Sequence, residues 1–189
     1  LKNISAFRLE LLTDPNLPAR GPGRSFKGTC ALTEFKVEAR DPSDPTNKIS
    51  VKFARAMADF EQPESLLETN FYDKTENRRV TGPASFAIDG DDKTAWGIDA
   101  GPGRRNQERK VVFECATNVG FPNGTILMVS LVQNHGGWNS DDLMNNNLGR
   151  FRISVTSNAG PVPADPLPKR ARDILAVSRQ RRTPSQTAS

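Results

Sequence analysis

The sequence predicts an all-β protein, a two-sheet antiparallel sandwich followed by a linker and a short helix. Three observations lead to this fold class. Short segments alternate apolar and polar residues, as half-buried strands do. Long polar loops separate them, and the 189 residues include 14 prolines and 14 glycines. No helical periodicity is sustained before residue 165. Alternation of this kind turns one face of each strand inward and the other to water.

The expected strands follow one another at short intervals. The pattern is clearest at the last of them, where Phe151, Ile153 and Val155 alternate with polar residues. We also expect Ile49, Val51 and Phe53 to point inward on an earlier strand. The expected strand segments are 7–12, 31–37, 49–53, 110–115, 125–133 and 151–156. Residues 59–81 are polar and weakly patterned, and they predict a loop excursion with a short helical turn near 63–67.

The chain divides into three parts by composition. Residues 1–160 are expected to form the sandwich, and the Pro-rich run 161–168 a stiff linker. Residues 169–189 then predict a basic helical tail that begins a neighbouring domain. The tail from residue 165 onward has six basic and two acidic residues, which accounts for the whole net charge of +4. Residues 1–164 are therefore neutral, and their charge gives no reason to expect nucleic acid as a partner.

Hydropathy, the start of the chain and the two cysteines bear on the cellular location of the protein. No apolar run approaches the length of a membrane-spanning helix, so no membrane span is expected. The first residues look like a cut inside a longer chain, which favours a module of a larger protein. Cys30 and Cys115 each lie beside an expected strand. A disulfide and a pair of buried thiols would look the same in sequence, and both alternatives stay open.

An acidic turn occupies residues 87–96, Ala-Ile-Asp-Gly-Asp-Asp-Lys-Thr-Ala-Trp. Gly90 permits a tight turn, around which Asp89, Asp91 and Thr94 can direct oxygen atoms inward. Calcium takes six to eight oxygen ligands of this kind, although the spacing is not that of an EF-hand. The alternative is a turn whose side chains bond only their own backbone. Trp96, which closes the turn, is interpreted as a core residue.

This turn and the strands around it resemble the discoidin-like, galactose-binding-like β-sandwiches, which include many carbohydrate-binding modules. The Ala-x-Asp-Gly-Asp-x-x-Thr-x-Trp pattern carries the resemblance. It implies a jelly roll with a structural calcium, completed by a Thr-Glu pair on another strand. Here Thr33 and Glu34 precede the turn, so the resemblance implies a circularly permuted strand order. The implied calcium ligands are Thr33, Glu34, Phe86, Asp89, Asp91 and Thr94.

A second resemblance covers most of the chain. Residues 17–37, 87–114 and 148–156 are similar to the central module of large secreted planctomycete proteins of unknown function, which often also carry a cytochrome-c-like domain. It implies a protein that is secreted, periplasmic or at the cell surface, with the neighbouring domains of its parent chain as partners. It implies no activity, and the haem motif of those larger proteins is absent from this sequence.

The loop 134–142 is the best candidate for a ligand-binding surface. Sugars are bound by an aromatic face together with planar hydrogen-bonding groups, and this loop offers both. A basic loop at 101–109 adds arginine forks that suit acidic or sulfated sugars. A solvated loop, and a tryptophan that only anchors its own loop, are the alternatives. The candidate residues are Asn134, His135, Trp138, Asn139, Asp141, Arg104 and Arg105.

The sequence therefore predicts a non-catalytic binding module that recognises a glycan or cell-surface polysaccharide. The alternative is a structural or interaction domain that scaffolds its neighbours and binds no soluble ligand. A polysaccharide hydrolase using His135 with Asp141 or Asp142 is a third hypothesis. We expect no enzyme, because no Gly-x-Ser-x-Gly motif or other nucleophile and base arrangement is present in the sequence.

Overall fold

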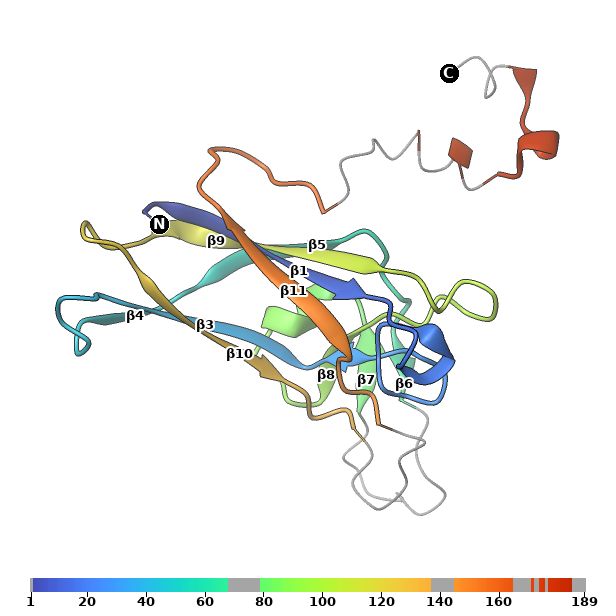
Figure 1. Ribbon diagram of the computed structural model, residues 1–189, viewed down its shortest axis with the longest axis horizontal. Coiled ribbons are helices and arrows are strands. Elements are labelled where there is room, and N and C mark those ends of the chain that lie inside the picture. Colours follow the sequence, from blue (N-terminus) through green and yellow to red (C-terminus); the bar gives the residue numbers. More distant parts are fainter. Residues whose placement is uncertain are drawn as a thin grey trace.

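The computed structural model describes residues 2–67, 79–136 and 145–164, together with 171, 174–175 and 177–184. Within these residues the regular elements are strands and short 3-10 helices (Figure 1). They form three sheets, so the predicted all-β class is confirmed. No helix in the described ranges is long and apolar enough to cross a membrane.

The first sheet has the strand order β11-β1-β9-β5. Its strands are β1 (Ile4–Leu12), β5 (Phe53–Ala58), β9 (Arg109–Val119) and β11 (Arg150–Thr156). All neighbours are antiparallel, and the register sets Phe7 of β1 opposite Phe113 of β9. The sheet thus joins the beginning, the middle and the end of the domain.

The second sheet has the order β10-β3-β4 and faces the first across the core (Figure 1). Its strands are β3 (Glu34–Arg40), β4 (Lys48–Ser50) and β10 (Ile126–Val132). Four phenylalanines join the two sheets, with Phe7, Phe53 and Phe113 on one and Phe35 on the other. The rings of Phe35 and Phe113 are stacked, with centroids 4.2 Å apart and planes 8° apart. The three fully buried rings, those of Phe7, Phe35 and Phe113, each contribute about 1.5–3 kcal/mol through the hydrophobic effect.

The third sheet lies at one end of the other two and has the order β2-β8-β7-β6. Its strands are β2 (Ala31–Leu32), β6 (Ser65–Leu66), β7 (Val80–Gly82) and β8 (Thr94–Gly97). β7 and β8 are parallel. Strands β2 and β3 are separated only by Thr33, so one run of chain passes from the third sheet into the second. Thr33 is fully buried at this junction.

A 3-10 helix, η2 (Ala84–Ile88), leads from β7 into the acidic turn. Ala84 and Ala87 of this helix join the core. Trp96 on β8 is also fully buried there, which confirms its interpretation as a core residue. Its indole Nε1 donates to the Phe60 carbonyl oxygen at 3.4 Å. The acidic turn therefore stands between two anchored segments, which fix its position.

Two expectations about local structure are wrong. Residues 63–67 hold no helical turn, because Ser65–Leu66 forms β6 and pairs with β7. Ile49 is not buried in the core: it lies opposite the buried Ala39 of β3, but its side chain is 43% exposed. It lies on β4, a three-residue strand at the edge of its sheet, where the opposite sheet does not cover it. Val51 is buried and Phe53 packs against the core, as expected.

The described end of the expected linker packs on the outer face of the first sheet. Val162 and Ala164 contact Ala6 and Val112. The Val162 N–H donates to Glu114 Oε1 at 2.9 Å. Residues 165–170 lie outside the described residues. Beyond them Arg179–Arg181 forms a 3-10 helix, η4, within the expected helical tail.

Candidate functional site

The acidic turn contacts a strand that is distant in sequence. Glu34, at the start of β3, accepts a hydrogen bond at its Oε1 from the Gly90 N–H at 2.6 Å. Gly90 has φ +82°, a conformation that favours glycine, and this turns its N–H toward β3. The segment containing Thr33 and Glu34 thus lies beside the turn, although 56 positions separate Glu34 from Gly90.

The turn is also closed by its own side chains. Asp89 accepts from the Asp91 N–H at 2.9 Å and from the Thr94 hydroxyl at 2.8 Å. Asp91 accepts from the Lys93 N–H at 2.9 Å. These are the local bonds expected of an acidic turn. Within the described ranges no group of three or more His, Cys, Asp and Glu side chains is close enough to hold a metal ion.

The surroundings of Glu34 at this turn disfavour its ionised form. The side chain is buried, and its desolvation raises the pKa of the carboxyl. The Gly90 N–H acts in the opposite direction, while the nearby Asp89 and Asp92 raise the pKa further. A carboxylate in these surroundings is favoured by added positive charge, whether from a proton or from a cation.

His135 connects the start of the predicted ligand loop to the interior. Its side chain is fully buried. Nε2 lies 3.1 Å from the carbonyl oxygens of both Val80 and Lys93, and therefore carries the proton. Nδ1 is then an acceptor for the Thr33 hydroxyl at 3.0 Å. Both ring nitrogens are occupied, so His135 acts as a hydrogen-bonding residue in the interior.

The neutral form of His135 is favoured by this site. Burial lowers the pKa of the imidazole, and the Arg79 charge lowers it further, whereas the two carbonyl oxygens act against the shift. The Thr33 hydroxyl also accepts from the Asn134 N–H at 2.9 Å. Asn134 and His135 therefore fasten the loop to the junction between β2 and β3.

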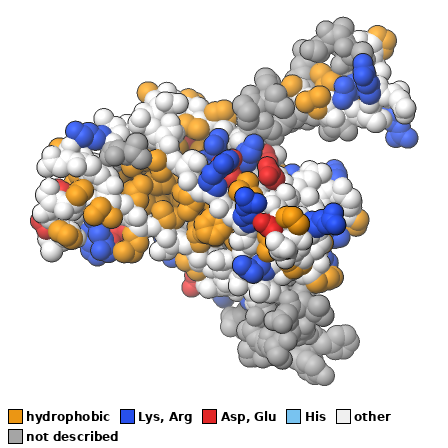
Figure 2. Space-filling view, viewed as in Figure 1, with side chains coloured by type: hydrophobic (Ala, Val, Ile, Leu, Met, Phe, Trp, Pro, Cys, Tyr) orange, Lys and Arg blue, Asp and Glu red, His pale blue; other side chains and the backbone are white. Residues whose placement is uncertain are grey.

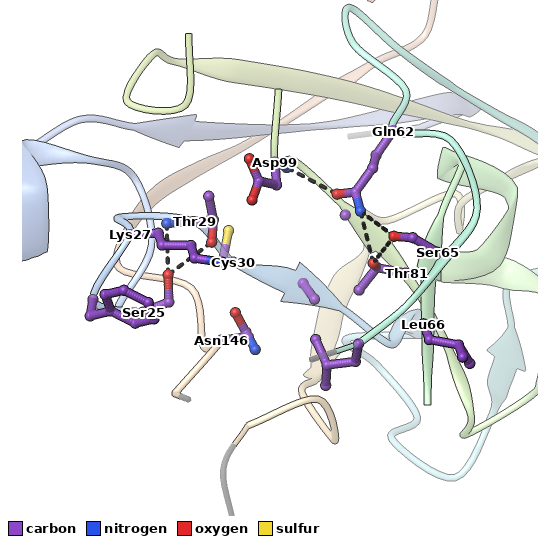
Figure 3. Close-up of a pocket in the computed structure, with 14 residues that line it drawn as sticks. Ser25, Lys27, Thr29, Cys30, Gln62, Ser65, Leu66, Thr81, Asp99 and Asn146 are labelled. Carbon is purple, nitrogen blue, oxygen red and sulfur yellow. Dashed lines mark hydrogen bonds between the residues drawn. The ribbon is translucent and has the colours of Figure 1, made fainter. Parts of the chain in front are cut away.

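A pocket of about 120 Å³ with a mixed polar and apolar lining opens beside the third sheet (Figure 3). Its walls come from four parts of the chain: the loop before β2, the β6 region, the strands β7 and β8 with the residues after them, and Asn146. Amide, hydroxyl, carboxylate and ammonium groups line it, with the half-exposed ring of Phe26 among them. The polar lining residues are Ser25, Lys27, Thr29, Gln62, Ser65, Thr81, Asp99 and Asn146.

The loop that forms one wall depends on a close backbone approach. The Gly23 N–H donates to the Gly28 carbonyl oxygen at 3.0 Å, and a Cβ at Gly23 would lie 1.9 Å from the Thr29 carbonyl oxygen. Ser25 Oγ lies 2.8 Å from Thr29 Oγ1 and accepts from the Thr29 N–H at 2.9 Å. The Gly-Pro-Gly-Arg run therefore holds a compact loop whose hydroxyls face the pocket.

Gln62 organises the opposite wall (Figure 3). Its Nε2 donates to Ser65 Oγ and to Thr81 Oγ1, both at 2.9 Å. Its Oε1 accepts from the Asp99 N–H at 3.0 Å. One amide thus joins β6, β7 and the segment after β8, and it fixes the hydroxyls of Ser65 and Thr81 at the pocket surface.

Asp99 is held in its ionised form. Burial alone would raise the pKa of this carboxyl, but hydrogen bonds from Arg105 Nε at 2.7 Å and from the Gly101 N–H at 2.9 Å outweigh it and hold the pKa below its ordinary value. Arg105 therefore acts at the pocket through Asp99. Arg104 is exposed, and its carbonyl oxygen accepts from Arg109 Nη2 at 2.9 Å.

The pocket contains a thiol that is not a nucleophile at neutral pH. Burial raises the pKa of Cys30 to about 12. Cys115 is half-buried, and burial raises its pKa to about 11. The sequence left a disulfide and a pair of thiols as alternatives. In the structure both cysteines are free thiols. A thiol with so high a pKa stays protonated and unreactive near pH 7.

Only some of the ligand residues expected from the sequence lie near the pocket. Arg105 reaches the pocket through Asp99, and Asn134 and His135 fasten the loop whose other end, Asn146, lines the pocket. The Asn146 side-chain amide donates to the His135 carbonyl oxygen at 3.0 Å. Trp138, Asn139 and Asp141, with Asp142, lie outside the described residues.

Comparison of the chain with protein-family models, with curated proteins and with solved structures gives no match.

Proposed function

We propose that this protein is a non-catalytic binding module that recognises carbohydrate in the pocket beside the third sheet. The observation that carries the proposal is the combination of groups in that pocket. Planar amides and a carboxylate, which suit sugar hydroxyls, lie with hydroxyl groups next to the half-exposed Phe26 ring, which suits sugar C–H groups. The internal bonds of Gln62 and Asp99 supply the preorganisation that binding requires.

The ligand class that the proposal favours is an acidic sugar, uronic or sulfated. Lys27 lines the pocket, and its ammonium lies 5.4 Å from the centre of the Phe26 ring. Arg105 adds a second positive charge behind Asp99. A ligand carboxylate or sulfate would be attracted by these two cations. Screening the protein against neutral, uronic and sulfated oligosaccharides tests the class directly.

A binding role without catalysis is supported by the state of the reactive groups. The Cys30 thiol is held protonated by burial, and both nitrogens of His135 are engaged inside the protein. Asp99 is paired with Arg105. A hydrolase that used His135 would have to release it from the interior first.

The proposal includes a structural calcium at the acidic turn, as the resemblance to galactose-binding-like sandwiches implies. Its support is the donor set: Glu34, Asp89, Asp91 and Thr94 supply only oxygen atoms, which calcium prefers. The hydrogen bonds among these residues already close the turn without an ion. Because calcium takes six to eight oxygen ligands, the backbone carbonyls of Thr33 and Phe86 would be needed to complete its ligand shell. A bound calcium would offset the mutual repulsion of these carboxylates and tie the turn to β3.

We also propose a specific fold for this β-sandwich. A permuted, jelly-roll sandwich of the galactose-binding-like kind is supported by the bond between Glu34 and Gly90. In this chain the Thr-Glu strand comes before the turn, yet it contacts the turn as the resemblance requires. The resemblance to the central module of secreted planctomycete proteins, and the extracellular or periplasmic location it implies, rest on the sequence alone.

A further inference from the structure

Strand β10 is an open edge of the second sheet. In the part of the chain that the structure describes, it pairs only with β3. Its seven residues, Ile-Leu-Met-Val-Ser-Leu-Val, include no charged residue, no proline and no glycine. An exposed edge strand presents unpaired backbone N–H and C=O groups, and proteins ordinarily protect such edges.

The other sheet edges carry the protection that β10 lacks. β11 presents Arg150 and Arg152. β5 contains Arg55 beside an irregularity in its register. β4 is three residues long and carries Lys48, and β2 and β6 have two residues each. Charges, bulges and shortness are the usual devices against edge pairing. The contrast singles out β10.

Both faces of β10 also leave apolar surface open. On the outer face Ile126 and Met128 are 50% and 47% exposed. On the core-facing side Leu127, Val129 and Leu131, which lie opposite Ala39, Val37 and Phe35 of β3, are only partly buried. Figure 2 shows hydrophobic side chains gathered between the layers that contain β11 and β10 in Figure 1. Such a surface at an unprotected edge is characteristic of an interface.

We propose that β10 pairs with β10 of a second copy of this chain. The two strands run antiparallel about a two-fold axis at Val129, the middle residue, and they join the second sheets into one continuous sheet. Self-pairing fits because a two-fold interface requires one patch to complement itself. In this register Met128 faces Ser130 of the other copy and Ile126 faces its Val132, so no like charges meet. The core-facing side chains of both strands lie on the same side of the joined sheet and cover each other.

The test uses the full chain and two double variants at exposed positions. In Met128→Lys with Ser130→Lys, each lysine of one copy faces a lysine of the other. In Met128→Lys with Ser130→Glu, each lysine faces a glutamate instead. The mass of each protein is measured by sedimentation equilibrium over a range of concentrations, and circular dichroism melts check that all three are folded.

The proposal predicts a dimer for the unmodified chain. The Lys/Lys variant should dissociate with a dissociation constant at least about tenfold higher, because like charges directly opposite each other destabilise strand pairs. The Lys/Glu variant should recover the dimer. A monomeric unmodified chain at every concentration, an undiminished dimer in the Lys/Lys variant, or a folded Lys/Glu variant that stays monomeric would each overturn the proposed pairing. This outcome is independent of carbohydrate binding, because neither position lines the pocket.

Discussion

Glu34 Oε1 accepts a hydrogen bond from the Gly90 N–H at 2.6 Å, and this bond joins the first residue of β3 to the acidic turn. Glu34 is buried, so its charge must be balanced locally. The same turn carries Asp89, Asp91 and Asp92. The buried Glu34 carboxylate also experiences the negative charges of Asp89 and Asp92, so folding and cation binding can be coupled at this turn.

Calcium is therefore expected to stabilise the protein through this turn. Adding a chelator should lower the melting temperature, and restoring calcium should raise it again. At a calcium concentration 100 times the dissociation constant, the gain is about 2.7 kcal/mol. The measurement is a thermal melt with and without calcium, followed by circular dichroism.

The matched variants separate binding from general stability. Glu34→Gln keeps an oxygen acceptor for Gly90 but removes the charge, so its melt should no longer respond to calcium. Asp92→Asn alters an aspartate of the same turn that is not among the implied ligands, and it should keep the response. Equal melts of the unmodified protein in calcium and in chelator would refute the calcium site.

His135 should make stability depend on pH. Burial lowers its pKa in the folded state, while the unfolded chain keeps the ordinary value of about 6.5. Above that value both states are neutral and stability is complete. As the pH falls below it, the unfolded chain takes up a proton that the folded protein resists, and the free energy of unfolding decreases. Urea unfolding between pH 5 and pH 8 measures this decrease.

Because His135 is the only histidine, His135→Gln is a direct control. The variant is expected to be less stable at pH 7.5, since a buried hydrogen-bonding group is replaced, by about 1–3 kcal/mol. Its stability should nevertheless change less between pH 5 and pH 7 than that of the unmodified protein. A pH dependence that is the same in both proteins would assign the effect to other groups.

The two cysteines should behave as protected thiols. Burial raises the pKa of Cys30 to about 12 and that of Cys115 to about 11, so little thiolate forms at pH 8. Iodoacetamide is expected to label the native protein slowly and the unfolded protein at both sites, as read by mass spectrometry. A reductant should leave the melting temperature unchanged. An intact chain that is lighter by the mass of two hydrogen atoms, and that regains them with reductant, would instead show a disulfide.

Strand positions were largely predictable because alternation leaves a local signal. The alternation of Phe151, Ile153 and Val155 predicts β11, and the Gly-Asp pair after Ala87 predicts a tight, acidic turn. Ile49 shows the limit of that signal. It alternates as a core residue does, but its exposure depends on where β4 ends relative to the opposite sheet, and this is set by tertiary packing.

The pocket had no comparable signal. Gln62, Thr81 and Asn146 are polar residues in segments without pattern, and only the β6–β7 pairing and the closure of the 134–147 loop bring them together. Arg105 was expected to meet a ligand directly because arginine forks suit acidic groups. Its partner in the fold is Asp99, six residues earlier, and a local Asp-Arg pair of this spacing is the one clue the sequence offered.

The most direct test of the proposed function is calorimetric titration of the full chain with uronic and sulfated oligosaccharides at moderate salt. Phe26→Ala and Phe151→Ala are compared, since the two rings have similar exposure but only Phe26 lines the pocket. The account predicts saturable binding that Phe26→Ala weakens about tenfold or more, while Phe151→Ala leaves it unchanged. No binding by the folded protein, or equal binding by both variants, would contradict a carbohydrate site in this pocket and favour a scaffolding role.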